Sequence, residues 1–334
     1  MREERRRVQL TGGSTLIVSL PIKWARAAGI KPGDELRIIQ KDERSLIIVL
    51  DKRAEKDNIA ELRLSPEESL EDNFRYLIAY YLVGYEGIRL LSENGFDAEE
   101  RRWIKDEVRK RLIGMEVVEE ASNEIVLQSF LKYKDFTLQD SIKSMAKIIR
   151  SMHEDALLAL ERGDENLAKD VIERDNEIDR FYLLTVRQLK ASVEDPMLAA
   201  SMGFRSMRDA LGYRLIVKSM ERVADHIEKI ARHSLEMKGR IIGLEEIKKV
   251  GTLAIDAFMK SLEALSERDM RKANDVIREV NNITSMVEGV AEHVLKGQGS
   301  EVQKIHLWAV LESLRRIAEY SADISEITIN LGIK

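Results

Sequence analysis

The chain of 334 residues has no cysteine, only 4 prolines and 18 glycines, and few aromatic side chains (5%). Without cysteine it cannot carry a disulfide framework, a zinc ribbon, a cysteine-ligated iron–sulfur cluster or a thiol nucleophile, and a reducing compartment is favoured. Scarce glycine and proline argue against a β-sandwich, which needs frequent turns. Charge is abundant instead, since 34% of residues are acidic or basic, against roughly 25% in ordinary globular chains. This composition predicts a protein built mainly from long, solvated helices.

Long hydrophobic runs are also missing. The longest uncharged stretches near the N-terminal end, residues 10–22 and 76–85, are shorter than the about 18–20 residues that a membrane-spanning helix needs. No apolar segment follows the arginines of the opening MREERRRVQL, so this stretch does not resemble a secretory signal. The sequence therefore predicts a cytoplasmic protein with no membrane span.

Charges of opposite sign are separated along the chain. Residues 1–50 carry a net charge of +4, whereas residues 51–334 carry −9. A basic head on an acidic body predicts that the head alone binds a polyanion such as duplex DNA, while the body repels it. A solvated basic tail without a partner is the alternative interpretation of the same charges.

The first fifty residues predict a small β-rich unit. Two short strands separated by a Thr-Gly-Gly-Ser turn precede a short helix that ends at Gly29, and a hairpin follows. The strands are expected within residues 6–10, 16–20, 35–40 and 45–50, and the helix over 22–28. A unit of this size buries little of its own apolar surface, so we expect it to dimerise.

Residues 51–134 are predicted to form a charged connector (51–64) and a small α+β module. Ser65, followed by Pro66 and two acids, predicts a helix start. The expected elements are helices over 65–93 and 98–113 and strands over 115–120 and 124–130. The first helix carries a stripe that is expected in the core rather than around a ligand: Phe74, Ile78, Tyr81 and Tyr85.

From residue 137 onward the sequence is predicted to be helical and contains an internal repeat. Residues 159–178 recur after 105 positions, and residues 219–230 recur after 94. The expected helices cover 138–162, 164–192 and 198–238 in the first repeat and 243–266, 268–296 and 300–331 in the second. The prediction is two tandem three-helix bundles, within residues 137–238 and 240–334.

Two pairs of carboxylates lie beside the apolar stripes of the first repeat. Asp175 and Asp179 are one turn apart on its second helix, and Glu221 and Asp225 are one turn apart on its third. Together they could supply four hard oxygen ligands, which suit iron, manganese, magnesium or calcium. Acidic pairs at this spacing also occur on solvated faces with lysine partners. A cation is nevertheless the simplest compensation for like charges beside a core.

The second repeat does not keep these carboxylates. Asp175 and Asp179 correspond to Val280 and Thr284, and Glu221 and Asp225 correspond to Arg315 and Glu319. We therefore expect one metal site, in the first repeat.

The N-terminal pattern VQLTGGSTLIVSLPIKWARAAGIKPGDELRII resembles the SpoVT/AbrB family of swapped-hairpin DNA-binding domains. The resemblance rests on the strand that ends in Ser-Leu-Pro, the short helix after it and the Gly-Ile…Gly-Asp turn. It implies that two chains exchange hairpins into one small barrel and that the first loop and the short helix bind duplex DNA. The residues implied in DNA binding are Arg5, Arg6, Arg7, Thr11, Gly12, Gly13, Ser14, Thr15, Lys23 and Arg26.

The C-terminal repeats resemble the PhoU family of phosphate-uptake regulators. The strongest match is the motif pair DNEID, starting at Asp175, and ERVADH, starting at Glu221. The resemblance implies metal binding through these Asp and Glu pairs. Joined to an AbrB-like head, the whole resembles the PhoU-domain phosphate-uptake regulators of archaea.

The sequence thus favours a dimeric DNA-binding transcriptional regulator controlled by a metal-binding helical body. The alternative is an adaptor that does not bind DNA and instead restrains a phosphate transporter or its signalling partner. An enzyme is disfavoured, because none of the 5 histidines follows a glutamate by three positions, as di-iron oxidases require. The chain also has no G-x-x-x-x-G-K nucleotide loop.

Overall fold

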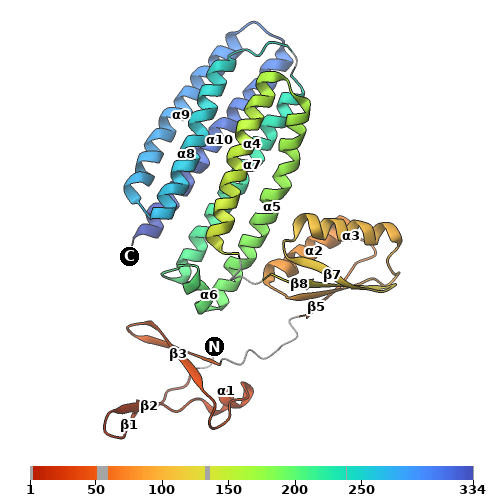
Figure 1. The fold of residues 1–334 in the computed structure, drawn as a ribbon. Coiled ribbons are helices and arrows are strands. Elements are labelled where there is room, and N and C mark those ends of the chain that lie inside the picture. The colour runs from red at the N-terminus through yellow and green to blue at the C-terminus, as the bar shows by residue number, and fades with distance from the viewer. Residues whose placement is uncertain (1–2, 51–58, 132–135, 238, 334) are drawn as a thin grey trace. The chain divides into compact units, whose positions relative to one another are not determined.

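The computed structural model describes residues 3–50, 59–131, 136–237 and 239–333 (Figure 1). The chain divides into two compact units, 1–58 and 59–334. Most of the predicted connector, residues 51–58, lies outside the described residues.

The head consists of two hairpins and a short helix. Its elements are β1 (Gln9–Thr11), β2 (Thr15–Ile17), α1 (Ile22–Ala27), β3 (Leu36–Asp42) and β4 (Ser45–Leu50). Strand β1 pairs with β2 and strand β3 with β4, both antiparallel. Gly12 and Gly13 have φ of 57° and 81°, so they make the tight β1–β2 turn that side chains with a Cβ disfavour. The predicted elements are present, although the first two strands are shorter than expected.

No described side chain of the head is buried in a single copy. Apolar residues that such a unit would normally cover are open to solvent, among them Leu10 (64%), Leu16 (69%) and Ile38 (63%). The head by itself therefore has no hydrophobic core.

The second unit begins with an α+β module. Its elements are β5 (Ile59–Arg63), α2 (Leu70–Val83), β6 (Gly87–Leu91), α3 (Ala98–Arg111), β7 (Met115–Glu120) and β8 (Glu124–Ser129). The sheet order is β5-β6-β8-β7, with β5 parallel to β6 and the other pairs antiparallel. Helices α2 and α3 lie on one face of this sheet (Figure 1). The core between them includes Leu77, Tyr81, Ile88 and Leu127.

Three of the boundaries predicted for this module were wrong. The helix expected from Ser65 starts instead after Ser69, whose hydroxyl accepts a hydrogen bond from the Asp72 amide, while the Asn73 side chain holds the backbone of Ser65. The helix ends at Gly84 (φ 105°) rather than near residue 93, and the following residues form β6. Strand β5 also occupies part of the predicted connector. The predicted second helix and the hairpin of β7 and β8 are confirmed.

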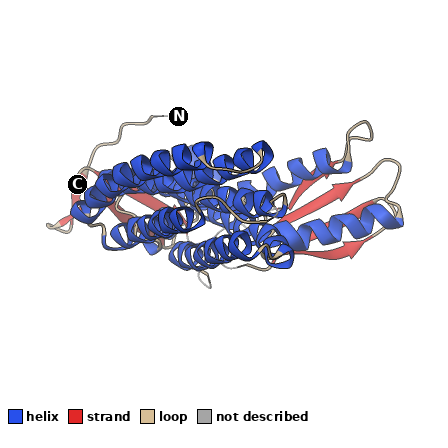
Figure 2. Ribbon diagram, turned by 90° about the horizontal axis from the view of Figure 1, so that it is seen from above, coloured by secondary structure: helices blue, strands red, loops and turns tan. Residues whose placement is uncertain are grey.

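Long helices make up the rest of the unit and lie side by side (Figure 2). They are α4 (Leu138–Arg162), α5 (Glu165–Glu194), α6 (Pro196–Ser201), α7 (Met207–Leu235), α8 (Leu244–Glu267), α9 (Met270–Lys296) and α10 (Glu301–Gly332). The expected helix over 198–238 is divided at Gly203 (φ 76°), and α7 starts after the cap Ser206. Among the described helices, none has a stretch apolar and long enough to cross a bilayer.

The two repeats share one hydrophobic core. Helices α7 and α10, the third helix of each repeat, pack against each other, and buried residues of both repeats form a single cluster. Gly251 of α8 allows α4 to approach closely, and its carbonyl lies 2.9 Å from Nε2 of the buried His153. The two bundles are thus joined along their length.

The α+β module is fastened to helix α5. Arg187, which is 2% exposed, donates hydrogen bonds to the carbonyls of Tyr81 and Tyr85 (2.9 Å for the latter) at the end of α2. Its guanidinium carbon lies 4.7 Å from the centre of the Tyr81 ring. Leu183, one turn earlier on α5, packs against the core of the module. These contacts make the module and the helical bundle one unit.

Candidate functional site

Helices α5 and α7 pack against each other and carry the four predicted metal ligands. Asp175 lies on α5 between the fully buried Val171 and Ile178, so the spacing that buries these apolar side chains also turns the carboxylate toward the bundle. Glu221 on α7 is 8% exposed and follows the buried Met220. The packing of two apolar stripes therefore brings acidic side chains of both helices toward one another.

The electrostatics show that these carboxylates form one cluster. Burial raises the pKa of Asp175 to about 7, and the negative charges of Asp179, Asp225, Glu228 and Glu221 contribute to this rise. An Asp with this pKa is partly protonated at neutral pH, because ionising it beside other carboxylates is unfavourable.

Two positively charged side chains oppose the electrostatic repulsion at Asp179. Asp179 is exposed as a residue, but partial desolvation of its carboxylate and the charge of Asp225 raise its pKa, whereas Lys218 and Arg111 lower it. Arg111 belongs to α3, so the α+β module contributes positive charge to this cluster. Arg111 itself is paired with Glu71 (2.8 Å) and Glu107 (2.5 Å).

Only one of the two carboxylate oxygens of Glu221 has a hydrogen-bond partner among the described residues. Its Oε1 accepts a hydrogen bond from Lys218 at 2.5 Å, while its buried Oε2 has no hydrogen-bond partner among the described residues. Burial raises the pKa of Glu221, and the hydrogen bond from Lys218 opposes this shift. A buried carboxylate oxygen without a partner is costly, which favours binding of a cation.

The donor set fits a hard cation, since all of its members are carboxylates. In the described part of the chain, however, no three acidic or histidine side chains converge closely enough to enclose an ion. The four predicted ligands are thus brought into one cluster but are not already arranged around a common point.

Sequence reasoning missed one member of the cluster, Glu228. It lies on α7 three residues after Asp225, pairs with Arg232, and acts on Asp175. Its i, i+3 spacing from Asp225 could have identified it, because residues three apart share a helix face.

The second repeat replaces this cluster with internal ion pairs. Arg315 stands at the position of Glu221 and pairs with Glu312 (2.6 Å) and Glu319. Arg316 also pairs with Glu319, at 2.5 Å. The second bundle therefore has a positively charged arginine side chain at the position where the first has an acid.

All ten predicted DNA-binding residues of the head are exposed. Lys23 and Arg26 project from α1, and residues 11–15 form the β1–β2 turn with its flanking strand ends. In the segment before β1, Arg5 pairs with Glu3 at 3.4 Å and Arg6 pairs with Glu4. These pairs reduce the positive charge of that segment but leave α1 unaffected.

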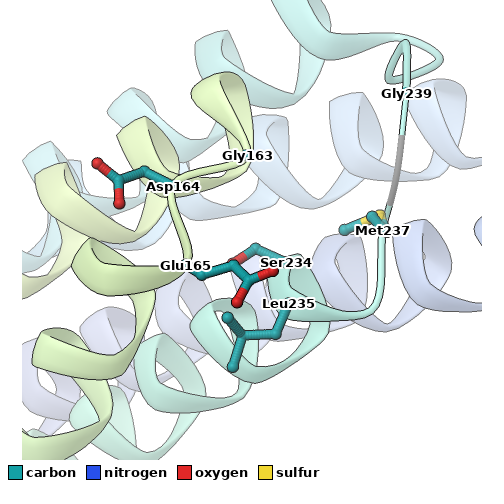
Figure 3. Close-up of a pocket in the computed structure, with 7 residues that line it drawn as sticks. All are labelled: Gly163, Asp164, Glu165, Ser234, Leu235, Met237 and Gly239. Carbon is teal, nitrogen blue, oxygen red and sulfur yellow. The ribbon is translucent and has the colours of Figure 1, made fainter.

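A cavity of about 240 Å³ lies where the α4–α5 turn meets the end of α7 (Figure 3). Its lining residues are Gly163, Asp164, Glu165, Ser234, Leu235, Met237 and Gly239. The Asp164 carboxylate accepts hydrogen bonds from the amides of Asn166 and Leu167 and so caps α5. Asp164 and Glu165 make the described part of this lining acidic.

Comparison with known families agrees with the architecture. The PhoU domain model matches residues 142–233 and 247–328, which together are more than half of the chain. The chain belongs to the PhoU family. A second model, for the MazE bacterial antitoxin (antidote-toxin recognition), matches residues 9–58, and the chain thus has an AbrB-like N-terminal domain. The PhoU matches cover both halves of the shared helical core.

Two curated relatives are similar to more than half of the chain. The phosphate-specific transport system accessory protein PhoU homolog of Clostridium acetobutylicum is 24% identical over 202 residues, which cover 58% of this chain and 90% of the relative. The homolog of the same name in Borreliella burgdorferi is 22% identical over 213 residues, covering 59% and 93%. Because these relatives are matched almost whole, about two fifths of this PhoU-family chain is additional to what they contain.

Solved structures show the same fold. The phosphate transport system regulatory protein PhoU from Streptococcus pneumoniae has a TM-score of 0.52 and 22% identity, covering 58% of this chain and 92% of that chain. PhoU from Pseudomonas aeruginosa has a TM-score of 0.52 and 20% identity, covering 58% and 94%.

Proposed function

We propose that this PhoU-family protein regulates phosphate uptake as a dimeric, DNA-binding transcriptional regulator whose helical body binds metal and controls the head. The relatives named as accessory proteins of phosphate-specific transport support the physiological role. The AbrB-like match over residues 9–58 supports DNA binding.

The observation that carries the proposal is the head's surface. No described residue of a single head is buried, so the unit needs a second copy to gain a core. A second copy would cover the apolar residues of the head. The basic side chains of α1 are not among these residues, so we expect them to stay exposed on the dimer. The charge contrast of +4 on residues 1–50 and −9 on the rest favours a polyanion at the head alone.

The first repeat supports metal binding. Asp175, Asp179, Glu221 and Asp225 would hold iron, or else manganese, magnesium or calcium, and Glu228 adds negative charge beside them. A bound cation would neutralise the repulsion that now favours protonation of Asp175. The resulting change in α5 and α7 is the signal that we propose reaches the head.

DNA binding by the full chain tests this function. The double substitution of Lys23→Gln and Arg26→Gln should weaken binding to duplex DNA. The slope of log affinity against log salt should become shallower by about 0.9 for each phosphate that the variant no longer neutralises. Arg162→Gln with Lys190→Gln is the matched control, because it removes the same charge from exposed positions of the body. It should leave binding unchanged.

The alternative adaptor function predicts a different result. A protein that only restrains a transporter or its signalling partner would not bind promoter fragments of phosphate-transport operons at about 150 mM salt, where non-specific contacts are already weakened. Failure of the unmodified chain to bind under these conditions would contradict the regulator and favour the adaptor.

A further inference from the structure

Strand β5 forms an open edge of the module's sheet. The four-stranded sheet has the order β5-β6-β8-β7, and among the described strands β5 pairs only with β6. It contains no proline, its pairing with β6 has no bulge, and Ile59 at its start is 43% exposed. An edge of this kind offers unpaired backbone donors and acceptors to another strand.

The opposite edge, β7, is protected against such pairing. Its pairing with β8 is irregular between Val117 and Glu119, and it carries three glutamates, at positions 116, 119 and 120. Bulges and like charges are the usual means by which proteins prevent edge strands from joining. The module therefore blocks one edge and leaves the other available.

The charges of β5 suit pairing with a second copy of itself. Arg63 is exposed and makes no ion pair with any described residue. Glu61 lies 3.5 Å from Arg89, a long contact, whereas Arg89 is closer to Glu124, at 2.7 Å. Among the described residues, Glu61 therefore has one long ion pair, which it shares with the Glu124 partner Arg89, and Arg63 has none.

One antiparallel register satisfies these charges. If a two-fold axis passes through Leu62, Glu61 of each copy lies opposite Arg63 of the other, and Leu62 lies opposite its own counterpart. Oppositely charged cross-strand pairs are stabilising, and like charges in that position are not. A register centred on Glu61 would instead place two glutamates opposite each other.

The position of β5 in the chain favours this partner. Only eight residues, 51–58, separate β4 of the head from β5, and they span at most about 30 Å. The head dimer of the proposed function would therefore hold two copies of β5 at high effective concentration.

We propose that the β5 edges of two copies of this chain pair in antiparallel fashion around Leu62, so that their two sheets become one continuous sheet. The interface is separate from the head and from the carboxylate cluster.

Disulfide cross-linking tests the register, because the chain has no cysteine. The full-length double variant Glu61→Cys with Arg63→Cys should form an intermolecular disulfide rapidly on mild oxidation, since the two positions lie opposite each other. Either substitution alone should cross-link at least tenfold more slowly. In the single variants the two sulfurs come from diagonal positions about 7–8 Å apart, beyond the usual Cα separation of a disulfide. The matched control is Glu116→Cys with Glu119→Cys on β7.

Equal rates for the double, single and control variants would overturn the β5 interface. Light scattering of the reduced proteins separates this failure from failure of the proposed function. A dimer that does not cross-link selectively would contradict only the β5 pairing, whereas a monomer at micromolar concentration would contradict the head dimer and the β5 pairing together. Circular dichroism of the reduced variants verifies that they are folded.

Discussion

At the scale of single residues, Asp175 shows how packing perturbs a carboxylate. The apolar positions that fix α5 in the bundle also place this carboxylate among four other acids, and its pKa rises to about 7. Among the described residues, Lys218 and Arg111 offset part of the negative charge at Asp179. A site that is costly in the absence of a ligand is well suited to sensing that ligand.

Removing these charges should remove metal. We expect the charge-neutral double variant Asp175→Asn with Asp225→Asn to copurify with at least fivefold less metal than the unmodified chain, because two of the four carboxylates become neutral amides. Elemental analysis of the purified proteins measures this. Glu173→Gln, at an exposed position of α5, is the control. Unchanged metal content in the double variant would show that the ligands lie elsewhere.

Stability of the metal-free protein should depend on Asp175 with a definite sign. Its folded-state pKa of about 7 exceeds the unfolded value of 3.8, so between about pH 4 and pH 7 the folded state binds more protons and the free energy of unfolding falls as pH rises. Asp175→Asn should therefore raise the melting temperature at pH 8 by about 2–4 °C and have a smaller effect at pH 5. Calorimetry in a chelator tests this, and an equal gain at both pH values would contradict it.

At the scale of elements, the sequence predicts well what local chemistry determines. Helix α3 begins at Asp97, which forms a capping box with Glu100, and α4 begins at Thr137, which does so with Asp140. Such signals lie within four residues and can be recognised in a single sequence. The long helices and the β7–β8 hairpin were predicted from local sequence patterns, and the two bundles from the internal repeat.

The errors concern elements that depend on distant partners. The sequence predicts β6 as a continuation of the helix before it, because its apolar residues fit either element. The strands that pair with it, β5 and β8, are far away in the sequence. In the sequence, nothing distinguishes Arg187 from the other charged residues of its helix. Only the structure shows that it is buried against α2. Long-range pairing and desolvation leave no local signature.

Arg187 should control attachment of the module. We expect Arg187→Ala to cost about 2–4 kcal/mol at this contact, because the buried Tyr81 carbonyl and the partly buried Tyr85 carbonyl lose a charged donor. Hydrogen exchange at the end of α2 should then become at least tenfold faster while α8 and α9 keep their protection. Lys190→Ala, at an exposed position of the same helix, should have no such effect. Unchanged exchange in the Arg187 variant would contradict this role.

At the scale of the whole molecule, an exposed head is joined to a well-packed body. The body has one buried hydrophobic cluster in its helical bundle and another in its α+β module, whereas the described head has none in a single copy. We therefore expect folding of the head to be coupled to association. The small size of the head and its family resemblance both predicted association from the sequence, but only the structure shows that no described head residue is buried in a single copy.

Association should be sensitive to the head's apolar residues. We expect Leu16→Asp with Ile38→Asp to convert the full chain from dimer to monomer at micromolar concentration, because each charge would be buried in the dimer. Light scattering measures this, and circular dichroism should show that the helical body is retained. Substituting Glu43 and Glu93 with Asp is the conservative control. A variant that stays dimeric would place the principal interface outside the head.

We propose that the carboxylate cluster of the body governs DNA binding by the head. The most direct test is the DNA affinity of the full chain at fixed salt, measured in a chelator and then with Mn²⁺ or Fe²⁺. Coupling between sites is typically about 5–150-fold and is reciprocal, so DNA should change metal affinity by the same factor. We expect a change of at least fivefold in the dissociation constant for DNA, which disappears in Asp175→Asn with Asp225→Asn. Equal affinity with and without metal, or a change that survives in that variant, would contradict it.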